Sequence, residues 1–195
     1  MRSPGDKMRL GAIFNPTGHH VASWRHPRAD ADAGVNIDHY VDLARTAERG
    51  RFDMLFLADS LGVREASMEA LSRSAQYIAN FEPLTLLAAL ALVTRNIGLV
   101  ATASTSYNEP FHVARKFGSL DQISRGRAGW NLVTSTQQME AKNFGRETHY
   151  AHSERYQRAR EFTQVVLGLW DSWEDEAFVR DRIPACSLIQ RNCTR

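Results

Sequence analysis

PLTLLAALALVTRNIGLVAT, residues 83–102, contains one complete helix-to-strand unit. Pro83 suits the first turn of a helix, where its missing N–H leaves no hydrogen bond unmade. The residues up to Val93 are apolar nearly all round, so we expect this helix to be buried. Ile97–Thr102 then forms a short, almost continuous apolar run, which is typical of a strand covered on both faces. The stretch therefore predicts a helix followed by a strand of the same packed sheet.

Similar units lie on both sides of this stretch. Before it, Asn36 can cap a helix, and Gly50 is expected to end that helix in the left-handed conformation. After it, Pro110 begins a further helix, and Gly126 lies just past its end. The predicted strands are Met8–Phe14, Asp53–Ala58, Ile97–Thr102 and Arg127–Val133, and a last helix begins near Ser153. A strand followed by a helix is thus repeated four times.

This order predicts parallel strands, because a parallel neighbour needs a crossover connection about as long as a helix. Doubly wound open sheets and (β/α)₈ barrels both use the unit. No G-x-G-x-x-G follows Phe14, so the dinucleotide-binding fingerprint is missing. Polar residues gather after each strand, where the chemistry of a barrel sits. We therefore predict an α/β fold that is the N-terminal half of a (β/α)₈ TIM barrel, since a complete barrel needs about 250 residues.

The end of the chain differs in character. RIPACSLIQRNCTR, residues 182–195, contains Cys186 and Cys193, the only two cysteines, and has neither a helical period nor strand alternation. We expect residues 1–181 to form the barrel portion and residues 182–195 to be an irregular tail outside it.

Charge and hydropathy exclude several kinds of partner. The formal net charge is only +2, from 24 Lys and Arg against 22 Asp and Glu, so nucleic acid is not an expected partner. The longest apolar stretch is too short to span a bilayer, and MRSPGDKMRLG at the N-terminus lacks the core of a signal peptide. We therefore expect a cytoplasmic protein without a membrane partner.

The histidines do not follow a metal-ligand pattern. No H-E-x-x-H occurs, and no pair of histidines has metal-ligand spacing on a helix. We predict no metal site. His19 and His20 follow the first strand, where they line an active site or lie on the plain surface.

Polar residues at the ends of predicted elements are candidates for ligand binding. Asp59 closes a strand and can accept hydrogen bonds from a ligand or cap a turn. Thr102 begins a hydroxyl-rich strand end, which suits a neutral ring system or caps the next helix. Asn131 offers a donor and an acceptor to a heterocycle edge. His152 and Tyr156 share one side of a helix start that favours anions, unless Tyr156 merely heads the core stripe.

Several longer strings together resemble the bacterial-luciferase-like flavin monooxygenases. The strings are GHHVASWRHP, TAERGRFDMLFLADS, FEPLTLLAALALVTRNIGL, ATASTSYNEPFHVARKFGSLDQISRGRAGWNLVTS and HSERYQRAREFTQVVLGLWDSWEDEAFVRD. They resemble, in order, the branch that contains nitrilotriacetate monooxygenase component A, dibenzothiophene sulfone monooxygenase and the pristinamycin-type oxidases. The resemblance covers about Met8 to Asp181.

The resemblance implies a barrel that binds FMN, used as FMNH₂ from a separate NAD(P)H-dependent flavin reductase. Dioxygen would add to the reduced flavin to give a peroxide, which inserts one oxygen atom into a small organic substrate. The family also implies a homo-oligomer.

The same resemblance assigns roles to particular residues. Asp59, Thr102, His152 and Tyr156 match flavin-contacting positions, and Asn131 lines the same pocket. His19 and His20 fall on the substrate side. No residue is assigned as a catalytic acid or base.

Length separates this chain from the family that it resembles. Family members are about twice as long, because their barrel continues through further strand–helix units. We therefore expect a truncated chain that corresponds to the N-terminal half. Two alternatives stay open: a non-catalytic remnant, and a deazaflavin-dependent oxidoreductase that transfers hydride. ATASTSYNEP and GRAGWNLVTS favour the monooxygenase branch over the second.

Overall fold

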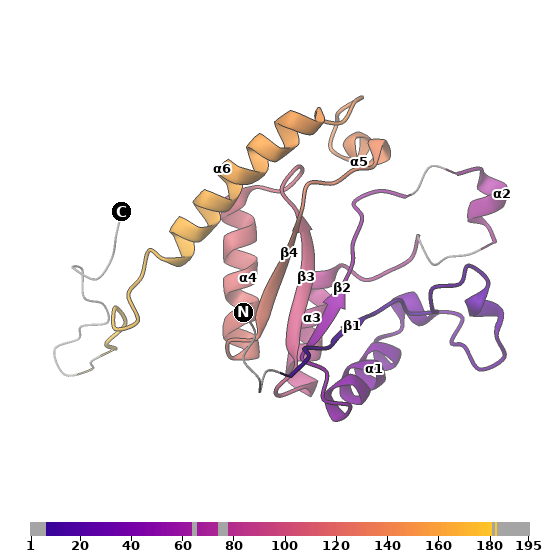
Figure 1. Cartoon of the computed structure of the whole chain (residues 1–195), viewed down its shortest axis with the longest axis horizontal. Coiled ribbons are helices and arrows are strands. Elements are labelled where there is room, and N and C mark those ends of the chain that lie inside the picture. Colours follow the sequence, from indigo (N-terminus) through magenta and orange to yellow (C-terminus); the bar gives the residue numbers. More distant parts are fainter. Residues whose placement is uncertain (1–6, 64–65, 74–77, 181, 183–195) are drawn as a thin grey trace.

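The computed structural model describes residues 7–63, 66–73, 78–180 and 182. A four-stranded parallel sheet forms its centre (Figure 1). The strands are β1 (Gly11–Ile13), β2 (Met54–Leu57), β3 (Gly98–Ser104) and β4 (Ala128–Val133). They lie in chain order, and each neighbouring pair is parallel. A doubly wound sheet would reverse its strand order at a switch point, so the order confirms the first half of a (β/α)₈ barrel.

Each strand is followed by one or two α-helices. The α-helices are α1 (Ile37–Arg49) after β1, α2 (Met68–Leu71) and α3 (Pro83–Val93) after β2, α4 (Pro110–Ser124) after β3, and α5 (Gln138–Asn143) and α6 (His152–Trp170) after β4. Two short 3₁₀ helices, η1 (Ser23–Arg25) and η2 (Ala33–Val35), lie in the loop after β1. The sequence did not predict α5. Except for Arg182, the predicted tail lies outside the described residues.

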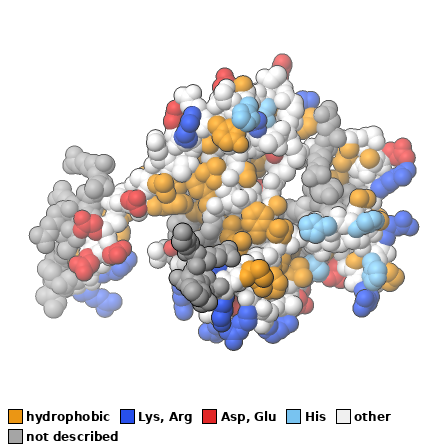
Figure 2. Space-filling view, in the orientation of Figure 1, with side chains coloured by type: hydrophobic (Ala, Val, Ile, Leu, Met, Phe, Trp, Pro, Cys, Tyr) orange, Lys and Arg blue, Asp and Glu red, His pale blue; other side chains and the backbone are white. Residues whose placement is uncertain are grey.

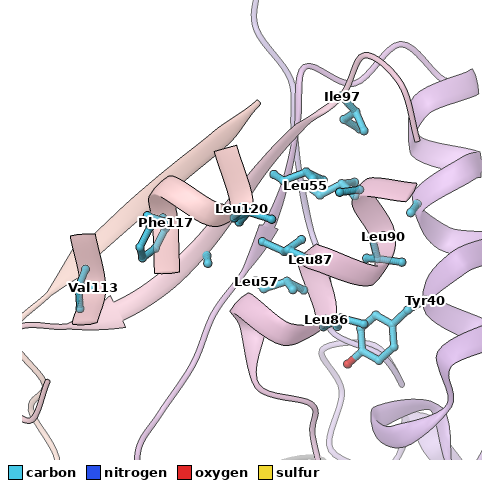
Figure 3. Packing of buried hydrophobic residues seen from close by; sticks show 14 of the residues in the cluster. Tyr40, Leu55, Leu57, Leu86, Leu87, Leu90, Ile97, Val113, Phe117 and Leu120 are labelled. Atoms are coloured by element: carbon cyan, nitrogen blue, oxygen red, sulfur yellow. The ribbon is translucent and has the colours of Figure 1, made fainter. Parts of the chain in front are cut away.

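The hydrophobic core lies between the sheet and four helices, α1, α3, α4 and α6 (Figure 3). Leu55, Leu57 and Leu99 point from the strands toward the helices and are at most 5% exposed. Leu87 and Leu90 of α3 meet them and are fully buried. Because side chains alternate along a strand, the residues between these leucines point to the opposite face of the sheet.

That opposite face of the sheet is open. Ile13 and Met54 lie on it and are 58% and 40% exposed. Glycine makes room there for bulky neighbours: a Cβ on Gly11 would lie 2.7 Å from Met54 Cε, and a Cβ on Gly129 would lie 3.0 Å from Val100 Cγ2. In a closed barrel this face is the packed interior.

Hydrophobic side chains also reach the surface. Figure 2 shows them across the middle of the molecule, where the sheet lies, with Lys and Arg mostly toward the periphery. Within the described part of the chain, no helix has both the length and the apolar character needed to cross a membrane.

The predicted helix boundaries are mostly confirmed. The Asn36 side chain accepts hydrogen bonds from the N–H groups of Asp38 and His39, as expected of an N-cap. Pro110 begins α4, and Gly126, just past its end, has φ +81°. Gly126 therefore supplies a left-handed residue where the chain reverses.

Two local predictions are wrong. The helix α3 is not buried all round, since Leu92 is 79% exposed. Its buried residues form a single stripe, and Leu92 falls outside that stripe. Gly50 is not left-handed, because its φ is −71°. Its N–H still bonds to Thr46 O in the last helical turn, and the reversal comes one residue later, at Arg51 with φ 60°.

Glu48 and Arg127 brace the end of the sheet opposite the strand carboxyl ends. Glu48 Oε1 accepts from three successive backbone N–H groups, those of Arg95, Asn96 and Ile97, at 2.7–3.2 Å. Arg127 donates to oxygen atoms of residues 91, 94 and 97. Burial acts to raise the pKa of Glu48, but the three N–H donors and the charge of Arg127 hold that pKa below its usual value. The carboxylate therefore fixes the turn that leads into β3.

We expect Leu87→Ala to lower the free energy of unfolding by about 2–5 kcal/mol, because it removes a fully buried side chain and leaves a cavity. The matched variant Leu92→Ala should change it by less than about 0.5 kcal/mol, since Leu92 is exposed. Denaturant melts of both variants measure the difference. Equal losses of unfolding free energy in the two variants would contradict the observed orientation of α3.

We expect Glu48→Ala to cost about 1 kcal/mol of stability at neutral pH, because three N–H donors lose their acceptor. A carboxyl whose pKa is lowered by folding stabilises above its ordinary pKa of 4.5 and loses that effect as the pH falls below it. The melting temperatures of wild type and variant should therefore converge at acid pH. A difference in melting temperature that stays constant with pH would contradict a stabilising role of the Glu48 carboxylate.

Candidate functional site

Polar side chains meet at the edge of the sheet formed by the carboxyl ends of the strands. Asp59 follows β2, and Thr102 and Ser104 lie in the second half of β3. Together with Glu140 of α5 and Tyr156 of α6, they line one cavity of about 430 Å³. This volume is within the range of small-molecule sites. Three predicted residues, Asp59, Thr102 and Tyr156, thus share a cavity.

Thr102 and Asn131 are neighbours across the β3–β4 pair. The register places them side by side, and Asn131 Nδ2 donates to Thr102 Oγ1 at 2.9 Å. Thr102 is only 5% exposed, so this contact fixes its hydroxyl. Asn131 does not itself line the cavity and reaches it through Thr102.

The rings of His152 and Tyr156 are in contact at the start of α6, tilted by 36° with centroids 4.6 Å apart. Tyr156 lines the cavity and is 52% exposed, so it does not head the core stripe of the helix. That stripe begins at Ala159 and continues through Phe162 and Val166. His152 is exposed and does not line the cavity, but it packs against the ring of Tyr156.

A second cavity of about 600 Å³ adjoins the first at the end of β2. Asp59, Ser60, Leu61 and Gln137 line both cavities. His19 lines the second, together with neutral amides such as Asn143.

The structure separates His19 from its neighbour. His20 lines neither cavity. Its Nδ1 accepts from the Ala22 N–H at 3.1 Å within a local turn. Figure 2 shows histidine side chains over the loop after β1 and near the start of α6.

The carboxyl of Asp59 is electrostatically unusual. Asp59 is exposed in the open cavity, but the atoms packed around its carboxyl still desolvate it. Desolvation raises the pKa of Asp59 to about 6; the N–H of Ser60 works against this rise, while the charges of Glu82 and Glu140 add to it. A carboxyl with this pKa passes from its neutral to its charged form as the pH rises toward neutrality.

Hydroxyl groups tie the ends of β3 and β4 together. Ser104 Oγ lies 2.7 Å from Ser135 Oγ, and Ser106 Oγ donates to Thr134 O at 2.5 Å. Arg158 of α6 donates to Thr105 O at 2.8 Å. These contacts fix the cavity wall mainly through hydroxyl and carbonyl oxygens, which suit a neutral ligand ring. Arg158 also forms an ion pair of 3.8 Å with Glu109.

Glu140 lines the site but was missed by sequence reasoning. It belongs to the segment between β4 and α6, which has no apolar period to mark α5. Glu140 is 4% exposed, and no local pattern separates it from surface glutamates.

Within residues 7–63, 66–73, 78–180 and 182, no group of three or more His, Cys, Asp or Glu side chains could hold a metal ion.

Comparison with known proteins identifies the family of this chain. Residues 17–185 match the sequence profile of the luciferase-like monooxygenases. The chain belongs to this family. The resemblance inferred from the sequence is thereby confirmed.

Two curated relatives come from bacteria. N-acetyl-S-(2-succino)cysteine monooxygenase of Bacillus subtilis (strain 168) is 56% identical over 182 residues, 93% of this chain and 40% of the relative. Nitrilotriacetate monooxygenase component A of Aminobacter aminovorans is 50% identical over 183 residues, 91% of this chain and 40% of the relative. The chain thus spans about 40% of the length of these relatives.

Solved structures of the family have the same fold over the shared part. Long-chain alkane monooxygenase (LadA) superposes with a TM-score of 0.88 at 35% identity, over 96% of this chain and 45% of LadA. Riboflavin lyase (RcaE), solved with modified FMN and riboflavin, gives a TM-score of 0.88 at 30% identity, over 97% of this chain and 44% of the lyase.

We expect Asp59→Asn to become more stable relative to wild type as the pH rises from about 4 to about 7. Because folding raises the pKa of Asp59 from 3.8 to about 6, its contribution to stability is greatest below the lower value and is lost as the pH rises through the higher one. The neutral amide avoids this loss. Melting temperatures of both proteins across this pH range measure it.

Asp53→Asn is the matched control. The Leu10 N–H and Arg9 hold the pKa of Asp53 below its usual value, so removal of its charge should have the opposite pH dependence. If Asp59→Asn differs from wild type by a constant amount at every pH, Asp59 is not desolvated in the folded chain.

Proposed function

We propose that this chain forms the reduced-flavin-binding half of an FMN-dependent monooxygenase. The observation that carries the proposal is the meeting of Asp59, Thr102 and Tyr156 around one cavity at the carboxyl edge of the sheet. In (β/α)₈ enzymes the chemistry sits at this edge. The identity with relatives named monooxygenases supports the same conclusion.

The residues present fit a flavin ring. An isoalloxazine is flat, with polar edges that need hydrogen-bond donors and acceptors. Thr102, Ser104 and Asp59 offer such groups, and the exposed face of Tyr156 offers an aromatic surface. Among the residues that the structure describes, none hydrogen-bonds to the buried Glu140 Oε2, so hydrogen-bonding capacity remains unused at the cavity wall.

In this proposal Asp59, Thr102 and Tyr156 hold the flavin, with His152 behind Tyr156 and Asn131 behind Thr102. FMN, bound as FMNH₂, would supply the reaction with dioxygen that leads to oxygenation of a small organic substrate. The chain's part is to orient the ring and to keep water from it. Asn131 keeps the Thr102 hydroxyl in place, and His19 lies where a substrate would enter from the second cavity.

We further propose that a separate NAD(P)H-dependent flavin reductase supplies the FMNH₂. The word component in the name of the nitrilotriacetate relative supports a system of more than one protein. Self-association into a homo-oligomer is part of the same proposal. The exposed apolar side chains Val165, Leu169 and Trp173 are available for it.

Binding of FMNH₂ under anaerobic conditions, followed by flavin fluorescence, tests the proposal. We expect saturable binding by the wild-type chain and binding weakened about tenfold by Tyr156→Ala, which removes an aromatic contact. Phe111→Ala is the control, because Phe111 is similarly exposed and lines neither cavity. Absence of saturable binding by the wild type would favour a non-catalytic remnant, and preferential binding of a deazaflavin would favour hydride transfer.

A further inference from the structure

The helix α5 holds the segment that directly follows Asp59. Glu140 Oε1 accepts from Ser60 Oγ at 3.0 Å and from the Leu61 N–H at 3.2 Å. From the next turn of α5, Asn143 Nδ2 donates to Leu61 O at 2.7 Å. Residues 60 and 61 are thus bound through a side chain and through both backbone groups of Leu61.

The packing between this segment and α5 is close. A Cβ added to Gly62 would lie 3.1 Å from Glu140 N and 3.2 Å from Glu140 Cα. Contacts this short leave little room for a side chain, so Gly62 lets the backbone of residues 60–62 lie against α5.

A glutamate is unfavourable for folding stability at position 140. It is only 4% exposed, and its Oε2 is buried without a hydrogen-bond partner among the described residues. Burial of a carboxylate costs free energy unless hydrogen bonds compensate it, and half of this group is uncompensated. A neutral side chain would cost less if α5 had only to pack.

The held segment is part of the cavity wall. Ser60 and Leu61 line both cavities, Glu140 lines the first and Asn143 lines the second. Asp59 lies at the junction of the two cavities, and the N–H of Ser60, in the held segment, hydrogen-bonds to its carboxyl. Its direction therefore depends on how the following residues are held.

We propose that Glu140 is a positioning residue of this site, which fixes residues 60–62 from α5 and so sets the direction of the Asp59 carboxyl toward the bound ligand. It acts through Leu61 and Ser60 and takes no part in bond making. The inference rests on the proposed function for the identity of the ligand, but the contact from Glu140 to Leu61 does not.

Hydrogen exchange of the Leu61 amide, measured by NMR on the full chain without flavin, tests the positioning step. Glu140→Ala should speed this exchange about tenfold or more, because the amide loses its acceptor. Glu140→Gln should restore slow exchange, since its amide oxygen can accept the same bond. Glu147→Gln is the control, because it removes an exposed carboxylate from the same connection.

The proposal would be overturned if the Leu61 amide of Glu140→Ala exchanged at the wild-type rate, or if Glu140→Gln failed to restore slow exchange of that amide. Asn143→Ala covers the case in which Glu140→Ala does not fold. It removes the contact to the Leu61 carbonyl and so loosens the segment that Glu140 holds, which should speed exchange of the Leu61 amide, but by less than loss of Glu140, its direct acceptor.

Anaerobic FMNH₂ binding separates this inference from the proposed function. Glu140→Ala should bind about tenfold more weakly than wild type, while Glu140→Gln and Glu147→Gln stay within about threefold. If the wild type binds and Glu140→Ala binds equally well, the positioning role fails and the proposed function stands. If the wild type does not bind, the proposed function fails, and the exchange rates alone decide the role of Glu140.

Discussion

Parallel pairing of β3 with β4 is the constraint on which the site depends. In its register Thr102 lies beside Asn131, so the amide of one side chain reaches the hydroxyl of the other. Since all four strands run the same way, their carboxyl ends lie at one edge of the sheet. Asp59 comes to this edge from β2, and α6 brings Tyr156 to it. A slip of β3 by one residue in this pairing would turn Thr102 to the helix face of the sheet and remove its hydroxyl from the cavity.

The two faces of the sheet have different roles. The helix face buries Leu55, Leu87 and Leu99 and provides most of the apolar burial that stabilises the fold. The polar residues lie on the open face and at the carboxyl edge of the sheet, where the two adjoining cavities are also found. The curated relatives match this chain over about 40% of their own length. The described half thus contains a core of its own beside a ligand-facing edge.

Stability is lowered locally where the cavity is built. Desolvation of Asp59 and burial of Glu140 both cost free energy, and Glu140 Oε2 has no hydrogen-bond partner in the described part of the chain. At the opposite end of the sheet, Glu48 and Arg127 are well supplied with hydrogen bonds. The costly carboxyls of Asp59 and Glu140 thus lie at the cavity, and the well-bonded pair Glu48 and Arg127 lies at the other end of the sheet.

The sequence alone determined the four strands, the helices of ten residues or more and the family, because burial along a helix or strand repeats with a local period. It also marked Asp59, Thr102 and Tyr156, each of which lies near an end of such an element. Tertiary structure alone decided that Leu92 faces solvent, that His20 turns away from the cavities and that Glu140 holds Leu61, 79 residues away in the chain. Contacts across that separation form only once the strands have paired, so no local pattern encodes them.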